Sequence, residues 1–310
     1  RDSLELSVRE LAAEAGLTSV DRVTPLGIGY NTLFDIDDKF VIRIGTSEDG
    51  ECFPKSAEIL RLIDRKIAAP RLVHSDFTKK TVPYNVLILE KVHGWLPHEF
   101  WLDSAAHQRG VLLADLGRQI AELHAQPVAD LQHMGEPFHV SVLRDALANL
   151  DAAASAGRIA SRKLTRVRDF ILEHASVLDV PRPCLTHCDL HCNNMLFSAD
   201  GLAGLLDFDD ATLGDPMLDL HSLVDPRQSM QWAEFGQDHE ELFRIVSSNY
   251  PLEVNDLMVT KLKLLSLLEA SYGFAPSDRA PVYDLPEANL RYRAVFDERR
   301  YERLADTLSR

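Results

Sequence analysis

Histidine, aspartate and asparagine gather in the run Thr-His-Cys-Asp-Leu-His-Cys-Asn-Asn, residues 186–194. Within it, His187, Asp189 and Asn194 follow the spacing H-x-D-x4-N, and Asp207 ends an apolar run 13 residues after Asn194. Phosphoryl transfer needs a group that orients the incoming hydroxyl, and oxygen ligands for Mg²⁺ at the nucleotide phosphates. Asp189 can supply the first, and Asn194 and Asp207 can supply the second. The pattern therefore indicates phosphoryl transfer.

A zinc site is the alternative chemistry for the same stretch. Cys184, Cys188 and Cys192 lie four residues apart with two histidines between them, and thiolate and imidazole are zinc ligands. Structural zinc sites usually need two pairs of closely spaced ligands, and the fourth cysteine, Cys52, is distant in the sequence. The spacing therefore favours phosphoryl transfer.

Three motifs here resemble those of the aminoglycoside phosphotransferase family, small-molecule kinases built on the protein-kinase fold. Residues 187–194 resemble the family's loop H-G-D-x-H-x-x-N, residues 205–210 its segment I-D-W/F-D/E, and residues 214–220 its segment G-D-P-x-x-D-L. The three occur in the right order within about 35 residues, and residues 116–124 match a helix common in the family.

The resemblance implies a role for each motif residue. Asp189 would accept or orient the proton of the acceptor hydroxyl, and His187 would buttress the loop. Asn194 and Asp207 would bind Mg²⁺, with Asp209 near enough to assist.

Two further acids, Asp215 and Asp219, would brace the fold rather than touch a ligand. The loop departs from the family pattern at Cys188, which replaces a glycine, and at Cys192 and Asn193, which replace Pro-Gly. None of these three positions need supply a ligand oxygen, so we expect the loop to survive the changes.

A nucleotide-binding region would precede these motifs. Gly27, Gly29 and Asn31 lie between two β-prone runs, where glycines let backbone N–H groups approach phosphates. Arg43 stands where kinases carry a lysine that pairs with phosphate.

The helix partner of Arg43 should be a glutamate, and Glu58 is the nearest candidate, although Ser56 could equally align there. Glu90 and Val92 would belong to a hinge whose backbone reads the purine.

The elements that must position these residues form two groups. In the first, β-prone runs at 33–36 and 40–44 flank Asp37-Asp38, which indicates a hairpin turn, and further strands are predicted at 71–74 and 85–89. Apolar residues at helical spacing predict a helix from about Pro54 to Lys66.

The second group is mainly helical, with one inserted hairpin signalled by Asp200-Gly201 and a predicted helix from Val295 to Leu308. We therefore predict an α+β, two-lobed protein-kinase-like fold. Its antiparallel-sheet nucleotide lobe would span residues 1–92, its hinge would lie near 90–94, and its helical catalytic lobe would span 93–310.

Composition narrows the partners. The 310 residues include 33 basic and 48 acidic side chains, a net charge of −15, which argues against nucleic acid or an anionic membrane as partner. Residues 1–92 carry a net −2 and residues 93–310 a net −13, which favours a cationic acceptor. No apolar run reaches the roughly 18–20 residues of a membrane helix, and the N-terminus has no apolar signal segment. We expect a cytoplasmic monomer or dimer with reduced thiols.

The leading hypothesis is an ATP- or GTP-dependent, Mg²⁺-requiring kinase of a small-molecule hydroxyl, with an aminoglycoside or related antibiotic as acceptor and resistance as its outcome. A choline-, homoserine- or methylthioribose-like alcohol is the alternative acceptor. A protein kinase is disfavoured because Gly214 follows Asp207 after only six residues, too few for an activation segment. Arg43 and the thin glycine turn leave a catalytically inactive, nucleotide-binding module as a third hypothesis.

Overall fold

The computed structural model describes residues 2–28, 31–45, 52–131, 138–157, 159–275 and 285–309. Contacts divide the chain into two compact units. Unit 1 comprises residues 1–96 and 193–211, and unit 2 comprises residues 97–192 and 212–310. No helix among the described residues is long and apolar enough to cross a membrane.

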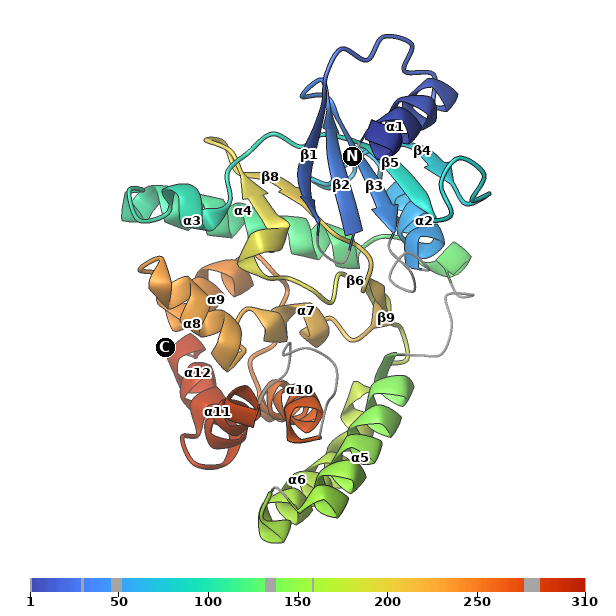
Figure 1. Ribbon diagram of the computed structural model, residues 1–310. Coiled ribbons are helices and arrows are strands. Elements are labelled where there is room, and N and C mark those ends of the chain that lie inside the picture. The colour runs from blue at the N-terminus through green and yellow to red at the C-terminus, as the bar shows by residue number, and fades with distance from the viewer. Residues whose placement is uncertain are drawn as a thin grey trace. The chain divides into compact units, whose positions relative to one another are not determined.

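Unit 1 is built on a five-stranded antiparallel sheet (Figure 1), in the order β1-β2-β3-β5-β4. The strands are β1 (Val23–Ile28), β2 (Asn31–Ile36), β3 (Phe40–Gly45), β4 (Leu72–Asp76) and β5 (Val86–Glu90). Asp37 and Asp38 both have positive φ, 54° and 59°, and Lys39 N donates to Ile36 O at 3.0 Å. This is the two-residue hairpin turn predicted between β2 and β3.

The two faces of this sheet carry different side chains because successive residues of a strand point to opposite sides. Ile42 and Ile44 of β3 belong to an apolar core with Val8 and Leu11 of α1 (Asp2–Glu14). Arg43, between them in sequence, therefore lies on the other face, where its guanidinium carbon is 5.0 Å from the centre of the Phe53 ring.

Phe53 begins helix α2 (Phe53–Ile63), which contacts β4 and β5. The predicted helix is therefore present and ends three residues before Lys66. Its buried side chains pack toward the sheet, and they are Phe53, Ser56, Ala57, Ile59, Leu60 and Ile63.

A second hairpin, β7 (Met195–Phe197) and β8 (Leu202–Leu205), also belongs to unit 1. It turns at Asp200-Gly201, as predicted, with Ser198 N donating to Gly201 O at 2.8 Å. Trp95 pairs with Phe197 through two backbone hydrogen bonds of 2.8 and 2.9 Å.

This packing differs from the predicted division at residue 92, which left the hairpin in the helical lobe. It also changes the distribution of charge. Unit 1 carries 13 basic and 19 acidic residues, a net −6, and unit 2 carries 20 and 29, a net −9.

Unit 2 is mainly helical. Its first elements are α3 (Pro97–Phe100), α4 (Ala106–His124), α5 (Phe138–Ala156), α6 (Ser161–His174) and the strands β6 (Cys184–Thr186) and β9 (Thr212–Gly214), which pair antiparallel. Later come α7 (Met217–Ser222), α8 (Pro226–Glu234), α9 (His239–Ser248), α10 (Asp256–Phe274), α11 (Leu285–Phe296) and α12 (Arg300–Leu308).

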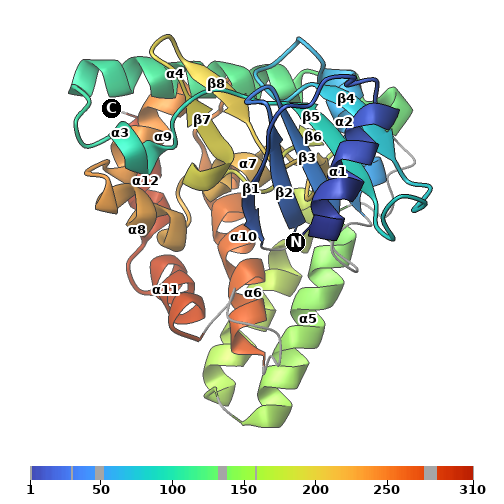
Figure 2. The ribbon, with the colours of Figure 1, turned by 45° about the horizontal axis from the view of Figure 1, so that its top comes forward.

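Helix α10 is the centre of unit 2: it contacts α5, α6, α7, α11 and α12. Figure 2 shows α5 and α6 as a helical hairpin with α10 next to it. The single helix predicted from Val295 to Leu308 was wrong. Helix α11 ends at Phe296 and α12 begins at Arg300. The two are separate because Arg299 has φ +49°, and left-handed backbone cannot continue a right-handed helix.

Gly117 allows α4 and α9 to approach closely, since a Cβ there would lie 2.3 Å from Val246 O. We expect Gly117→Ala to lower the free energy of unfolding by about 2 kcal/mol through overpacking. Gly110→Ala, on the same helix with no atom within 4 Å of the added Cβ, is the matched control. It should raise that free energy by about 0.5–1 kcal/mol, because alanine favours helix over glycine. Urea denaturation measures both, and equal effects would refute the close contact.

Candidate active site

The H-x-D loop of unit 2 is held by one buried carboxylate. Asp219, on α7, accepts hydrogen bonds from His187 N at 2.9 Å and Cys188 N at 2.7 Å. His124 Nε2, from α4, lies 2.9 Å from the same carboxylate, and the other ring nitrogen lies 2.7 Å from the Tyr250 hydroxyl. The loop that carries Asp189 is thus fixed to two helices of unit 2.

Asp219 is fully buried, yet it is stabilised in its charged form. Burial alone would raise its pKa, but the hydrogen bond and charge of His124, together with the charge and amide of His187, hold the pKa below its ordinary value. This buried position is consistent with the expectation that Asp219 braces the fold and does not touch a ligand.

Asp189 remains accessible within this anchored loop. Its side chain is 36% exposed, and one carboxylate oxygen lies 3.3 Å from His191 Nε2. His187 is fully buried and its Nδ1 accepts from Asp189 N at 3.3 Å, which places it where a buttressing residue must be. Cys188 adopts φ +63°, the left-handed region that glycine favours, at the position where the family motif has glycine.

Asn194 and Asp207 come together through the β7–β8 hairpin of unit 1. Met195 pairs with Leu205, and Leu206 N donates to Asn194 O at 2.9 Å, so both residues lie at the same end of the hairpin. Asp207 has φ +62° and a side chain that is 40% exposed. An amide oxygen and an accessible carboxylate are ligands that suit Mg²⁺, so the donor set fits that ion.

Arg43 lies against this carboxylate end. Its Nη2 is 3.1 Å from Asp207 Oδ1 and 2.8 Å from Asp209 Oδ2, while Asp209 Oδ1 accepts from Ser56 Oγ at 2.7 Å. Burial lowers the pKa of Arg43, but the two carboxylate charges outweigh it and raise the pKa above its usual value. On α2 it is Ser56, therefore, that faces this cluster, whereas Glu58 is exposed and its pairing with Arg43 stays a prediction.

The other predicted nucleotide contacts lie along the same sheet. Gly27 is exposed in β1 with open space at its missing Cβ, and Asn31 pairs with Gly45 at the start of β2. Gly29 lies outside the described residues.

Beyond β5, the backbone of Val92 makes no hydrogen bond to the part of the chain that the structure describes. The N–H groups of the two residues before it, Glu90 and Lys91, donate to Arg71 O and Lys39 O at 2.8 Å each. Val92 can therefore offer both its backbone N–H and C=O to a ligand.

The zinc alternative is not supported within the described ranges. Cys184 Sγ donates to Gly214 O, Cys188 Sγ lies beside Thr186 Oγ1, and Cys192 Sγ donates to Gln231 Oε1. Burial raises the pKa of Cys184 to about 12, so this thiol stays protonated.

A second polar cluster contains His221, Asp225 and Glu269, whose side-chain oxygen and nitrogen atoms lie within 4.8 Å of one another. Arg291 already bridges it, with Nε 2.8 Å from Asp225 and Nη2 2.8 Å from Glu269. Burial opposes the charge on Glu269, but the charge of Arg291 holds its pKa well below the ordinary value. The guanidinium of Arg291 therefore occupies the position that a metal ion would need.

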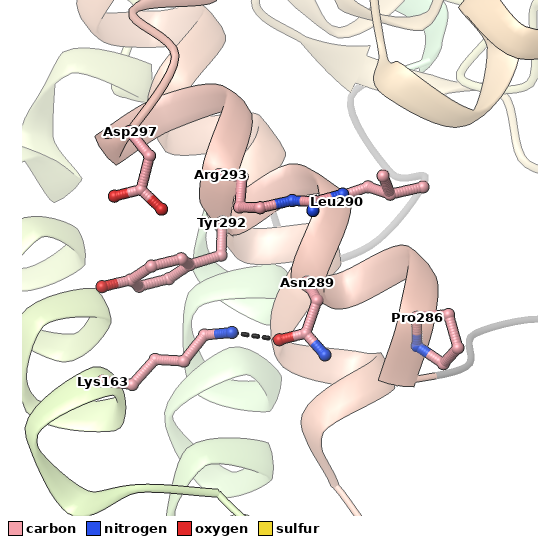
Figure 3. A pocket seen from close by; sticks show the side chains of 7 residues that line it. All are labelled: Lys163, Pro286, Asn289, Leu290, Tyr292, Arg293 and Asp297. Atoms are coloured by element: carbon pink, nitrogen blue, oxygen red, sulfur yellow. Dashed lines mark hydrogen bonds between the residues drawn. The ribbon is translucent and has the colours of Figure 1, made fainter.

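Two cavities among the described residues of unit 2 bear on the search for a site. One, of about 510 Å³, lies between α6 and α11, where Lys163 faces Asn289 (Figure 3). None of the predicted site residues lines it. The other, of about 60 Å³, includes Cys188 of the loop, with Glu269 and Tyr272 of α10 and several aliphatic side chains.

A sequence profile described as the phosphotransferase enzyme family matches residues 23–249, which include all three motifs. This chain belongs to that family. It is therefore a phosphotransferase, and the resemblance seen in the sequence is confirmed. No curated protein shows significant similarity to the chain.

Solved structures of related folds cover nearly the whole chain. An ADP-bound aminoglycoside phosphotransferase APH(2'')-Ib aligns with a TM-score of 0.69 at 17% identity, over 92% of this chain and 96% of that one. The GDP complex of aminoglycoside 2'-phosphotransferase-IIIa aligns with a TM-score of 0.69 at 18% identity, over 99% of both chains.

A choline/ethanolamine kinase family protein from Mesorhizobium loti aligns with a TM-score of 0.63 at 18% identity, again over 99% of both chains. At these identities the likeness establishes the protein-kinase-like fold, as predicted, and not the acceptor.

The structure adds two site features that the sequence did not assign. Asp219 was expected only to brace the fold, and the structure shows that it holds the amides on the N-terminal side of Asp189. The contact of Asp209 with Ser56 was not predicted: the sequence left Glu58 and Ser56 open as the helix position facing Arg43, and it placed Asp209 near the metal.

We expect Asp219→Asn to lower both the free energy of unfolding and kcat, because its amide group would turn a donor toward a backbone N–H or His124. The pKa of Asp219 is depressed in the folded protein, so its stabilising contribution is full above about pH 4 and is lost as the pH falls toward the folded value. The stability gap between wild type and variant should therefore narrow below pH 4.

Denaturation at pH 7 and pH 3 measures this gap, with Asp103→Asn, on the exposed surface of unit 2, as control. A gap that did not change with pH would contradict the proposed charge on Asp219.

Proposed function

We propose that the chain transfers the γ-phosphate of ATP or GTP to a hydroxyl of a small molecule. The observation that carries this proposal is the anchoring of the Asp189 loop by Asp219. This loop lies directly before Asn194 in the sequence. The hairpin then brings Asn194 to the same end as Asp207. The chain thus links a base to a candidate Mg²⁺ site through four intervening residues.

In the proposed reaction, the acceptor oxygen forms a bond to the γ-phosphorus while the bond between that phosphorus and the β,γ-bridging oxygen breaks. The nucleoside diphosphate leaves, and the hydroxyl proton passes to the Asp189 carboxylate. Asp189 suits this role because it is partly exposed while its backbone is fixed. His187 maintains the loop from its buried position.

Asn194 and Asp207 would hold Mg²⁺, which supplies positive charge at the β- and γ-phosphate oxygens. Arg43 lies beside Asp207 and can direct its guanidinium to the same phosphates. Gly27 and Asn31 would border the phosphates from the sheet, and the backbone at Glu90–Val92 would bind the base.

For the acceptor, we propose an aminoglycoside or related antibiotic. Unit 2 carries a net −9, and its smaller cavity presents the Glu269 carboxylate and the Tyr272 ring next to the residue before Asp189. Amino groups suit such a surface. Structures of related fold include a gentamicin complex and a kanamycin complex of other phosphotransferases.

A small metabolite alcohol of choline-, homoserine- or methylthioribose-like type is the second candidate, and one observation favours it. The cavity beside Cys188 measures about 60 Å³, well below the roughly 300–1,000 Å³ of typical small-molecule sites. Its aliphatic lining comes from Val142, Leu218, Leu265 and Leu268, and Arg291 offsets the charge of Glu269.

We expect ATP or GTP with Mg²⁺ to raise the melting temperature, because a ligand at 100 times its Kd adds about 2.7 kcal/mol to the native state. Asp189→Asn should keep this shift but lower kcat by about 10²–10⁴-fold, since it removes the base alone. Calorimetric scanning and a coupled nucleotide-consumption assay measure the two effects. Absence of any shift would refute nucleotide binding, whereas a shift without turnover on any acceptor would support an inactive binding module.

A panel of aminoglycosides and metabolic alcohols should separate the acceptor classes. For a polycationic acceptor, we expect KM to rise several-fold when ionic strength increases by roughly tenfold, because salt screens its attraction to unit 2. An uncharged alcohol should show a flat KM. Turnover of small alcohols alone, with no aminoglycoside phosphorylated, would exclude the first candidate.

A further inference from the structure

The buried cation of unit 1 has two acidic neighbours from the segment that follows β8. Arg43 is 8% exposed in the middle of β3, where it pairs with Leu33 on one side and Leu87 on the other. Its guanidinium contacts both Asp207 and Asp209, and the contact with Asp209 is the shorter, 2.8 Å against 3.1 Å.

In protein kinases the corresponding lysine is positioned by a glutamate on the neighbouring helix. Here Ser56 of α2, which has no charge, donates to the cluster, and the thiol of Cys52 at the N-cap of the same helix also contacts Asp209. Ser56 is fully buried and donates to Asp209 Oδ1 at 2.7 Å, while Asp209 Oδ2 accepts a hydrogen bond from Arg43 Nη2. The two carboxylate oxygens of Asp209 thus connect α2 to β3.

We propose that Asp209 is the positioning carboxylate for Arg43, in place of a helix glutamate, and that Ser56 orients Asp209 for this task. The inference deepens the proposed nucleotide site and rests on it. It gives Asp209 a different role from the metal-assisting one that the sequence suggests.

The charges explain why a second carboxylate is needed. Asp207 is the more exposed of the two, 40% against 17%, and is a proposed Mg²⁺ ligand. Once Asp207 binds a metal cation, its negative charge would be shared between that cation and Arg43. Arg43 would then lose part of the negative charge that balances it, although it remains buried. Asp209 retains that compensation and keeps the guanidinium directed at the phosphates. An arginine suits this arrangement because its planar fork can donate to two carboxylates and a phosphate from fixed directions.

The two roles for Asp209 predict different results for nucleotide binding without metal. In the positioning role, Asp209→Asn weakens the Kd of ADP measured in EDTA by about tenfold, since Arg43 loses its fixed direction. Ser56→Ala should weaken it in the same direction by a smaller factor. The Mg²⁺ concentration for half-maximal turnover at saturating ATP should stay unchanged in both variants.

Isothermal titration with ADP in EDTA, followed by Mg²⁺ titration of turnover, measures both quantities on the full chain. Asp200→Asn, at the exposed turn of the β7–β8 hairpin, is the matched control in the same unit. Thermal unfolding checks that each variant is folded. The double variant Ser56→Glu with Asp209→Asn moves the carboxylate onto α2 and should recover most of the lost affinity.

An unchanged ADP affinity in both variants would overturn the proposal, and so would a raised Mg²⁺ requirement without a change in ADP affinity, which is the signature of a metal ligand. Failure of the double variant to recover affinity would also overturn it, because a carboxylate would then not be what Arg43 requires. If wild type itself binds no nucleotide, the proposed function fails instead.

Discussion

The hydrogen bonds to Asp219 are the interaction on which the proposed chemistry of unit 2 depends. A carboxylate without exposure to water is costly to bury, and three donors offset that cost: two backbone amides and the imidazole of His124. Those amides belong to the residues directly before Asp189. One buried charge therefore both stabilises α4 against α7 and fixes the backbone that presents the proposed base.

Unit 1 follows the same principle with the opposite sign. One of its buried charges is a cation, Arg43, and the compensating charge comes from carboxylates that follow β8 rather than from the sheet. In each unit a buried charge lies next to backbone in an unusual conformation: Cys188, whose amide donates to Asp219, and Asp207, which pairs with Arg43, both have positive φ. Such strained backbone persists where the surroundings determine it, as they do at both positions.

Much of this arrangement could be predicted because short-range signals determine it. The spacing of His187, Asp189 and Asn194 indicates phosphoryl transfer, and Gly201, which has positive φ, follows Asp200 at the predicted turn. The β-prone run that became β3 was likewise predicted. These features depend on residues close together in the sequence.

The unpredicted features depend on contacts between distant segments. Ser56 and Glu58 lie on one predicted helix, and only the packing of α2 decides that Ser56 faces Asp209. The assignment of the second hairpin to unit 1 depends on Trp95 pairing with Phe197, more than 100 residues later. The break at Arg299 depends on a single left-handed residue with a side chain that gives no such signal.

The discontinuous path of unit 1 has a consequence for biosynthesis. The chain leaves this unit after Leu96 and returns at Asn193, so the last strands of unit 1, β7 and β8, emerge from the ribosome after all of α3 to β6. Until residues 207–209 have been made, Arg43 is a cation in an apolar sheet without these carboxylates. Unit 1 is therefore incomplete throughout the synthesis of the intervening helices, although all five strands of its main sheet have already been made. The addition of the β7–β8 hairpin and of residues 207–209 is a late, long-range folding step.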